Sequence, residues 1–139
     1  MLFTSKLLSA TKKTTVEGSP VKGWISDFLK EVVDNGTCYV WQDCVGITVA
    51  RLGEKAILIN HLYVPPEHRN QGKAKSAMGW LCDLADKHKV QYKLVADNEK
   101  REGGLSNNQL ATFYKSFGFV PSFPDAKGKY KKQLTRNPK

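Results

Sequence analysis

The sequence predicts a single α/β domain, residues 1–139, with a mixed and mostly antiparallel central sheet flanked by helices. The length and the 40% hydrophobic content suit one domain with a sizeable core. An early helical pattern is followed by short β-rich runs with turn-like connections, which favour antiparallel neighbours. Later, a strand, a long helix and another strand follow one another. Such a crossover is right-handed and places its two strands parallel.

The first 15 residues contain no acid and are rich in Ser, Thr and Lys, a composition shared with mitochondrial targeting segments. They also contain no arginine and no clear amphipathic helix. We therefore expect a first strand around residues 2–8, followed by a polar connection.

The first helix is predicted to begin at Ser19-Pro20, because serine is a favoured N-cap and proline suits the first helical position. Apolar residues recur there at steps of three and four, as on one face of a helix. They are Val21, Trp24, Ile25, Phe28, Leu29, Val32 and Val33. Asn35-Gly36 is expected to end the helix, and its aromatic side chains are expected in the core.

Three β-rich runs follow, at residues 38–41, 45–50 and 56–59. With turn-like dipeptides between them, they predict an antiparallel meander. The last run continues through Leu62 and Val64 to a double proline, a short polar loop and a long periodic helix from about Gly72.

The rest of the chain predicts a strand, a helix and a hairpin. Alternating residues mark the strand after the long helix: Val90, Tyr92 and Leu94. A polar loop over residues 97–105 leads to Ser106, which a glutamine follows at the spacing of a capping box. Residues 119–120 and 129–134 predict the hairpin, and the tail from Thr135 is expected to be frayed.

The loop before the long helix has the features of a phosphate-binding site. The first turn of a helix presents unpaired backbone N–H groups and partial positive charge, and it binds anions. Gly72 and Ala74 keep side-chain bulk away from this turn, whereas Arg69, Lys73 and Lys75 place full charges around it. The glycine motifs of P-loops and of dinucleotide-binding folds are both missing. We therefore predict a pyrophosphate cradle at this helix start.

Two motifs carry a family resemblance. Residues 69–74, Arg-Asn-Gln-Gly-Lys-Ala, follow a strand that ends in Leu-Tyr-Val-Pro-Pro-Glu-His. They resemble the acetyl-CoA signature Gln/Arg-x-x-Gly-x-Gly/Ala of the GCN5-related N-acetyltransferase (GNAT) family. Residues 107–119 resemble its second signature, Asn-x-x-Ala-x-x-Phe-Tyr-x-x-x-Gly-Phe, with Leu110 in place of alanine. The resemblance covers roughly residues 37–134 and implies a sheet splayed between its fourth and fifth strands.

The resemblance also implies that acetyl-CoA is the co-substrate. Backbone N–H groups at the end of the fourth strand would orient the pantetheine and polarise the thioester carbonyl, and the cradle would hold the pyrophosphate. The cofactor-binding residues implied in this way are Leu62, Tyr63, Val64, Arg69, Asn70, Gln71, Gly72, Lys73, Ala74, Lys75 and, for the pantetheine arm, Asn107.

Three residues are candidates for catalysis. Tyr114 occupies the position of the family tyrosine that protonates the CoA thiolate, and a phenol with a pKa of about 10 is protonated at neutral pH; the alternative is a core tyrosine. Asn60 and His61 occupy the position of an acidic residue that acts as base through water in many members. Histidine can accept a proton and asparagine can orient a water. Strand alternation predicts that only one of the two faces the cleft.

The net charge, the cysteine content and the lengths of the apolar runs limit the kinds of partner and location to expect. A net charge of +9 implies attraction to polyanions, whether nucleic acid or the phosphates of CoA, and is also compatible with a merely solvated surface. The three cysteines lack metal-site spacing and are odd in number, so we expect no metal site and no disulfide framework. A reducing, cytoplasmic location fits best. No apolar run reaches the roughly 18 residues that a membrane span requires.

We therefore predict an enzyme that transfers an acetyl group from acetyl-CoA directly to a primary amine of a small molecule, peptide or protein, as a monomer or homodimer. Two alternatives stay open. The amine would be carried on nucleic acid, as in an aminoacyl-tRNA, or the domain would bind CoA without catalysis. Within the enzyme reading, Glu99 and Glu102 on the long loop are candidates to select a cationic acceptor.

Overall fold

The computed structural model describes residues 19–96, 106–124 and 132–139. These residues form, in order, α2 (Pro20–Glu31), β1 (Val32–Asp34), β2 (Tyr39–Trp41), β3 (Val45–Arg51), β4 (Ala56–Tyr63), η1 (Pro66–His68), α3 (Lys73–His88), β5 (Gln91–Val95), α4 (Asn107–Lys115), β6 (Val120–Pro121) and β7 (Gln133–Arg136). The strand predicted at residues 2–8 and the loop over residues 97–105 lie outside the described residues.

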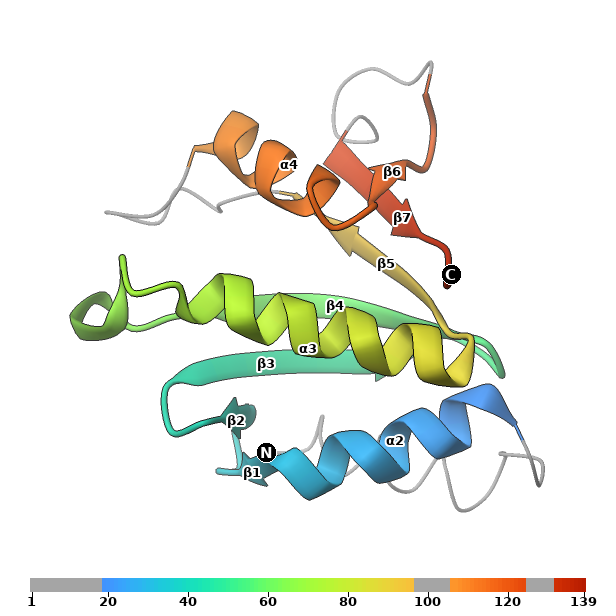
Figure 1. Ribbon diagram of the computed structural model, residues 1–139, viewed down its shortest axis with the longest axis horizontal. Coiled ribbons are helices and arrows are strands. Elements are labelled where there is room, and N and C mark those ends of the chain that lie inside the picture. The colour runs from blue at the N-terminus through green and yellow to red at the C-terminus, as the bar shows by residue number, and fades with distance from the viewer. Residues whose placement is uncertain (1–18, 97–105, 125–131) are drawn as a thin grey trace.

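The seven strands make one sheet in the order β1-β2-β3-β4-β5-β7-β6. Only β4 and β5 run parallel, and the other neighbouring pairs are antiparallel. Helices α2 and α3 lie beside one another across the same side of this sheet (Figure 1). The predicted meander, crossover and mixed sheet are thus confirmed.

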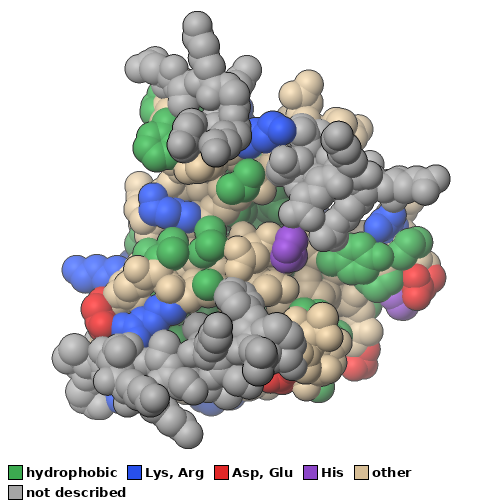
Figure 2. Space-filling view, turned by 180° about the vertical axis from the view of Figure 1, so that it is seen from behind, with side chains coloured by type: hydrophobic (Ala, Val, Ile, Leu, Met, Phe, Trp, Pro, Cys, Tyr) green, Lys and Arg blue, Asp and Glu red, His purple; other side chains and the backbone are tan. Residues whose placement is uncertain are grey.

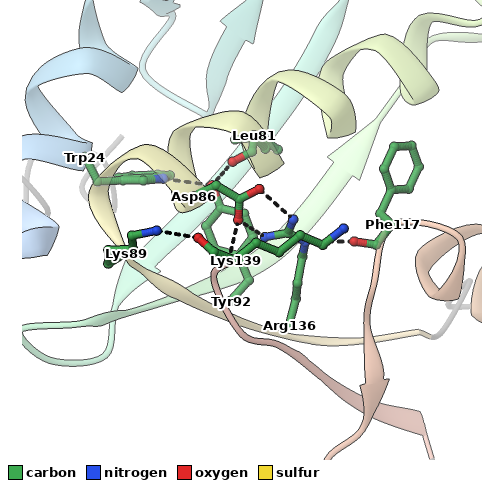
Figure 3. Close-up of polar contacts among 8 residues, drawn as sticks. All are labelled: Trp24, Leu81, Asp86, Lys89, Tyr92, Phe117, Arg136 and Lys139. Atoms are coloured by element: carbon green, nitrogen blue, oxygen red, sulfur yellow. Dashed lines mark hydrogen bonds and ion pairs between the residues drawn. The ribbon is translucent and has the colours of Figure 1, made fainter.

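The core lies between the sheet and these two helices. Trp24 of α2 donates its indole N–H to the Tyr92 hydroxyl of β5 at 2.7 Å, and that hydroxyl donates to the Leu81 carbonyl of α3 (Figure 3). All three side chains are buried. One buried phenol therefore ties together three elements that are far apart in the sequence, and it leaves none of its polar atoms unpaired.

The first helix is shorter than predicted. It ends at Glu31, and Val32 and Val33 instead form β1, paired with Trp41 and Val40 of β2. The prediction followed the helical spacing of apolar residues, but β-branched side chains pack well in strands, where cross-strand partners decide the outcome. Ser19 is the N-cap residue, although its hydroxyl donates to the Glu54 carbonyl at 3.2 Å and does not cap the helix.

The chain's last residues are also more ordered than predicted. Strand β7 extends through Thr135 and Arg136, which are both buried. The Arg136 guanidinium forms two hydrogen bonds to the Asp86 carboxylate of α3, at 2.9 and 3.0 Å, and a third to the Phe117 carbonyl (Figure 3). The Lys139 backbone N–H donates to the same carboxylate. These bonds explain why the tail is not frayed.

Acid should weaken the fold through Asp86. Its hydrogen bonds with Arg136 lower the pKa of the carboxyl, so the stabilisation is complete above the unfolded value of about 3.9 and is lost as the pH falls below it. At pH 7 we expect Asp86→Asn to lower the free energy of unfolding by about 2–3 kcal/mol, because a buried guanidinium loses its charged partner. Urea unfolding at pH 7 and pH 3 measures both effects.

The matched control is Asp83→Asn, which neutralises an exposed carboxylate on the same helix. It should change the unfolding free energy by less than about 0.5 kcal/mol. Equal destabilisation by the two variants would contradict the role assigned to Asp86.

No helix in the described ranges is long and apolar enough to cross a membrane. Within the same ranges, no group of three or more His, Cys, Asp and Glu side chains could hold a metal ion.

Candidate active site

Strands β4 and β5 separate partway along their length. They pair at Ala56, Ile57 and Leu58 of β4, and none of the later residues of β4 is paired with β5. Strand β4 nevertheless continues to Tyr63, held on its other side by β3. The sheet is therefore splayed at this point, as predicted, and among the described residues no strand pairs with the last part of β4 on the β5 side.

The loop between β4 and α3 reaches the helix through two left-handed residues. Asn70 has φ of 62° and Gly72, the residue preceding the helix, has φ of 74°. Asparagine and glycine are the residues that adopt this conformation most readily. A Cβ built on Gly72 would meet no atom within 4 Å, so the space in front of the helix start is open.

The first turn of α3 is arranged for an anion. The first hydrogen bond of the helix runs from the Ser76 N–H to the Gly72 carbonyl at 3.0 Å, so the N–H groups of Lys73, Ala74 and Lys75 have no acceptor within the helix. No side chain caps this end, and its first turn holds no acid. Two lysines there oppose the helix dipole, an arrangement that a bound anion would make favourable.

Arg69 lies on the wall of a neighbouring groove. Its Nε donates to the Val64 carbonyl at 2.9 Å, and its guanidinium lies over the Tyr63 ring, 5.6 Å from the ring centroid. Of the other residues predicted to bind the cofactor, Leu62 is half-buried on β4, whereas Asn70 and Gln71 are exposed in the loop. The structure thus brings the predicted set together around the end of β4 and the start of α3, Asn107 excepted.

The groove is open and has a volume of about 570 Å³. It lies on the side of the sheet opposite to the core, because its β3 residues alternate with the buried Val45, Ile47 and Val49. The residues that line it come from the β1–β2 turn, from β3 and β4, and from the loop before α3: Thr37, Cys38, Gly46, Thr48, His61, Tyr63, Pro66 and Arg69.

A β-bulge decides which candidate base faces this groove. Val49 of β3 pairs with Ile59 of β4, and Thr48, the residue before Val49, pairs with His61. Asn60 lies between the two pairs without a partner on β3, so it is an extra residue in β4. In a regular strand His61 would share the core face with Ile59. The bulge moves it to the groove face, beside Thr48. Asn60 is exposed but does not line the groove.

Tyr114 lies in α4 with 8% of its surface exposed. Its ring contacts Phe113 and Phe119 edge-on, and Phe119 stacks on Tyr92 of β5. Burial raises the pKa of Tyr114 to about 12, so the phenol is protonated at neutral pH.

The predicted capping box at the start of α4, between Ser106 and Gln109, is confirmed. Asn107 is the first residue of α4, but its side chain lies outside what the structure describes.

Comparison with known proteins agrees with this architecture. Residues 34–121 match the family model described as an acetyltransferase (GNAT) domain. The chain belongs to the GNAT family. Comparison with curated proteins finds no match. The family assignment therefore rests on the family model.

Two solved structures are among those that match this chain. The anti-CRISPR protein AcrVA5 is 19% identical, with a TM-score of 0.54 over 69% of this chain and 93% of its own. Tetrahymena GCN5 is 15% identical, with a TM-score of 0.48 over 99% of this chain and 89% of its own. At these identities the comparison concerns the fold alone.

Sequence reasoning missed five of the eight residues that line the groove, Gly46 and Pro66 as well as Thr37, Cys38 and Thr48, of which the last three show why. Thr37 and Cys38 line it from the β1–β2 turn, where Asn35 accepts hydrogen bonds from both of their N–H groups. Thr48 lines it because it pairs with His61. The pairing of β3 with β4 was predicted, but its register depends on the bulge, for which the sequence carries no turn or glycine signal. The three were therefore not predictable as a group.

Proposed function

We propose that this GNAT protein binds acetyl-CoA at the start of α3 and transfers its acetyl group directly to a primary amine held in the groove. The observation that carries the proposal is the position of one loop. On its α3 side lies an uncapped helix start with two lysines, and on its other side lies a groove that contains His61. The last part of β4, which does not pair with β5, leads from the groove to this loop.

The residues fit acetyl-CoA chemically. The N–H groups at the start of α3 suit a pyrophosphate, and the backbone of β4 from Leu62 to Val64 suits an amide-containing arm that adds along a strand edge. When bound, acetyl-CoA supplies an activated thioester, whose C–S bond breaks as the new C–N bond forms. The family's general reaction, acetylation of an amine, uses this chemistry.

His61 and Tyr114 have opposite roles in this proposal. The attacking amine must lose a proton, and His61 in the groove accepts it. Tyr114 donates a hydrogen bond to the leaving sulfur. A phenol with a pKa of about 12 is a weaker acid than a thiol, whose ordinary pKa is about 8.5. Tyr114 therefore stabilises the thiolate as a hydrogen-bond donor and keeps its own proton. The proton that His61 takes from the amine passes to water, and the released thiolate takes one proton from water, so the protons balance.

The net charge of +9 favours a second candidate, in which the amine is attached to nucleic acid. An affinity for RNA that falls steeply with salt would support it. A small amine or a peptide would show no such dependence.

The test combines binding and turnover. Calorimetry should show micromolar binding of acetyl-CoA, about −8 kcal/mol, and a thiol reagent should detect CoA release when an amine is present. We expect His61→Gln to lower kcat/KM for the amine by about 100-fold, the usual size of a general-base contribution. The affinity for acetyl-CoA should be almost unchanged.

His68→Gln is the matched control, because His68 lies in η1 and does not line the groove. It should keep the activity of the unmodified protein. Full activity in His61→Gln would remove His61 as the base and leave Asn60, acting through water, as the remaining candidate. Absence of acetyl-CoA binding would refute the proposed function and leave the CoA-independent role of a basic interaction module.

A further inference from the structure

The groove has an unusual balance of charge for a site that receives an amine. An amine is a cation in water, and an acidic wall would attract it. Among the described residues that line the groove, none is acidic, and Arg69 carries a full positive charge. Of the remaining lining residues, Cys38 and Tyr63 among them, His61 is the one whose side chain can carry a positive charge. An amine that enters this groove therefore needs a compensating negative group of its own.

Figure 2 views the molecule from the side opposite to that of Figure 1. On this face the Lys and Arg side chains lie mainly over the left and upper parts of the described surface, and the Asp and Glu side chains lie near its left edge and at its right and lower right. The net charge of +9 gives the molecule as a whole a positive rather than a negative field.

Arg69 is held in place while part of its guanidinium stays available. The Nε hydrogen bond to Val64 and the contact with the Tyr63 ring fix the plane of the group. No described residue forms a hydrogen bond or ion pair with Nη1 or Nη2 of Arg69. These two nitrogens form the planar pair of donors that binds a carboxylate or a phosphate with two parallel hydrogen bonds.

The spacing of the groove residues sets the size of the ligand. His61 and Tyr63 lie on the same face of β4, and positions two apart in a strand are separated by roughly 7 Å. The guanidinium lies over the Tyr63 ring. An amine beside His61 would therefore have its anionic group roughly 7 Å away. A volume of about 570 Å³ is in the range of small-molecule sites.

We propose that the acceptor is a small amine that carries a carboxylate or phosphate several bonds from its nitrogen, and that Arg69 binds this anionic group. This inference rests on the proposed function, since it assigns the groove to the acceptor. It opposes the alternative in which Glu99 and Glu102 select a cationic acceptor. The two therefore predict opposite charge preferences for amines of equal length.

Three amines of equal length test the preference: 5-aminopentanoate, 5-aminopentanamide and 1,5-diaminopentane. Binding is measured by NMR titration with CoA present in place of acetyl-CoA, so that no transfer takes place. We expect the carboxylate to bind about tenfold more tightly than the amide, a difference of 1.4 kcal/mol, and the diamine to bind least well. A second pair, 3-aminopropyl phosphate and 3-aminopropanol, shows whether phosphate or carboxylate is preferred.

Variants of Arg69 test whether this side chain causes the preference for the carboxylate over the amide. Arg69→Gln should bring the ratio of carboxylate to amide affinity close to one, and Arg69→Lys should keep part of it, because a point charge replaces the planar pair. The affinity of each variant for CoA is measured separately, so that CoA is saturating in every titration. Lys55→Gln is the matched control: it removes one positive charge from an exposed side chain between β3 and β4, outside the groove, and should leave the ratio near ten.

The outcomes separate the two proposals. A wild-type ratio near one, or tightest binding of the diamine, would overturn the inference without the need for any variant. An unchanged ratio in a folded Arg69→Gln would also overturn it. If charge discrimination is found but none of these amines is acetylated from acetyl-CoA, Arg69 binds an anionic ligand in the groove, but that ligand is not an acceptor, and the proposed catalytic function is contradicted.

Discussion

Replacing Gly72 by glutamate is expected to raise the dissociation constant of acetyl-CoA by at least about 100-fold, or 2.7 kcal/mol. Gly72 precedes the first turn of α3, where three backbone N–H groups have no acceptor in the helix, two lysines lie in the turn, and the space beside Gly72 is open. The new side chain would place a carboxylate in that space, where it would occupy the N–H groups and repel the pyrophosphate. Calorimetric titration with acetyl-CoA measures the loss.

Two further variants separate charge from backbone strain. At φ of 74° any side chain carries some strain, but asparagine tolerates this conformation best, so Gly72→Asn should lose much less affinity than Gly72→Glu. Gly79→Glu places the same charge farther along α3, at a glycine with similarly open space and no positive φ. It should bind acetyl-CoA as the unmodified protein does. If Gly72→Glu retains its affinity in a folded protein, the cradle lies elsewhere.

Replacing Tyr114 by phenylalanine should lower kcat by about 10- to 100-fold and change acetyl-CoA affinity little. The hydroxyl is nearly buried, and no described residue forms a hydrogen bond with it. A buried hydroxyl without a partner in the protein is costly. Its retention fits a role toward a substrate atom. Single-turnover measurements of CoA release isolate the chemical step.

Tyr39→Phe is the matched control for the loss of a hydroxyl. Tyr39 is a buried tyrosine of β2, and in the strand order β2 is far from β6 and β7, the strands that follow α4 in the sequence. That variant is expected to keep kcat. Because the pKa of Tyr114 is raised to about 12 by burial, its ionisation should also leave the pH profile of kcat flat between pH 8 and about 10. An unchanged kcat in Tyr114→Phe would leave the residue with a packing role only.

The parts of the fold that could be predicted are those with local signals. The capping box at Ser106, the double proline after β4 and the crossover through α3 each depend on neighbouring residues, and the structure has all three. The same holds for the helix start at Gly72, where the motif and the backbone geometry coincide.

The parts that could not be predicted depend on distant partners. Val32 and Val33 fit a helical period, and only their pairing with β2 makes them a strand. The tail is ordered because Arg136 meets Asp86, a residue 50 positions away. The groove likewise depends on strand register. Periodicity identifies the residues of β4, but it cannot show that Asn60 is an extra one.

That single extra residue has a wider consequence for how β4 tolerates change. In a regular strand, the loss of one residue would turn every following side chain to the other face. Loss of Asn60 would instead leave Ile59 opposite Val49 and His61 opposite Thr48 in regular pairing, so that His61 and Tyr63 would keep the groove face and Leu62 the core face. The arrangement of the groove therefore does not depend on this residue, whereas loss of His61 itself would remove the candidate base and leave Asn60 opposite Thr48.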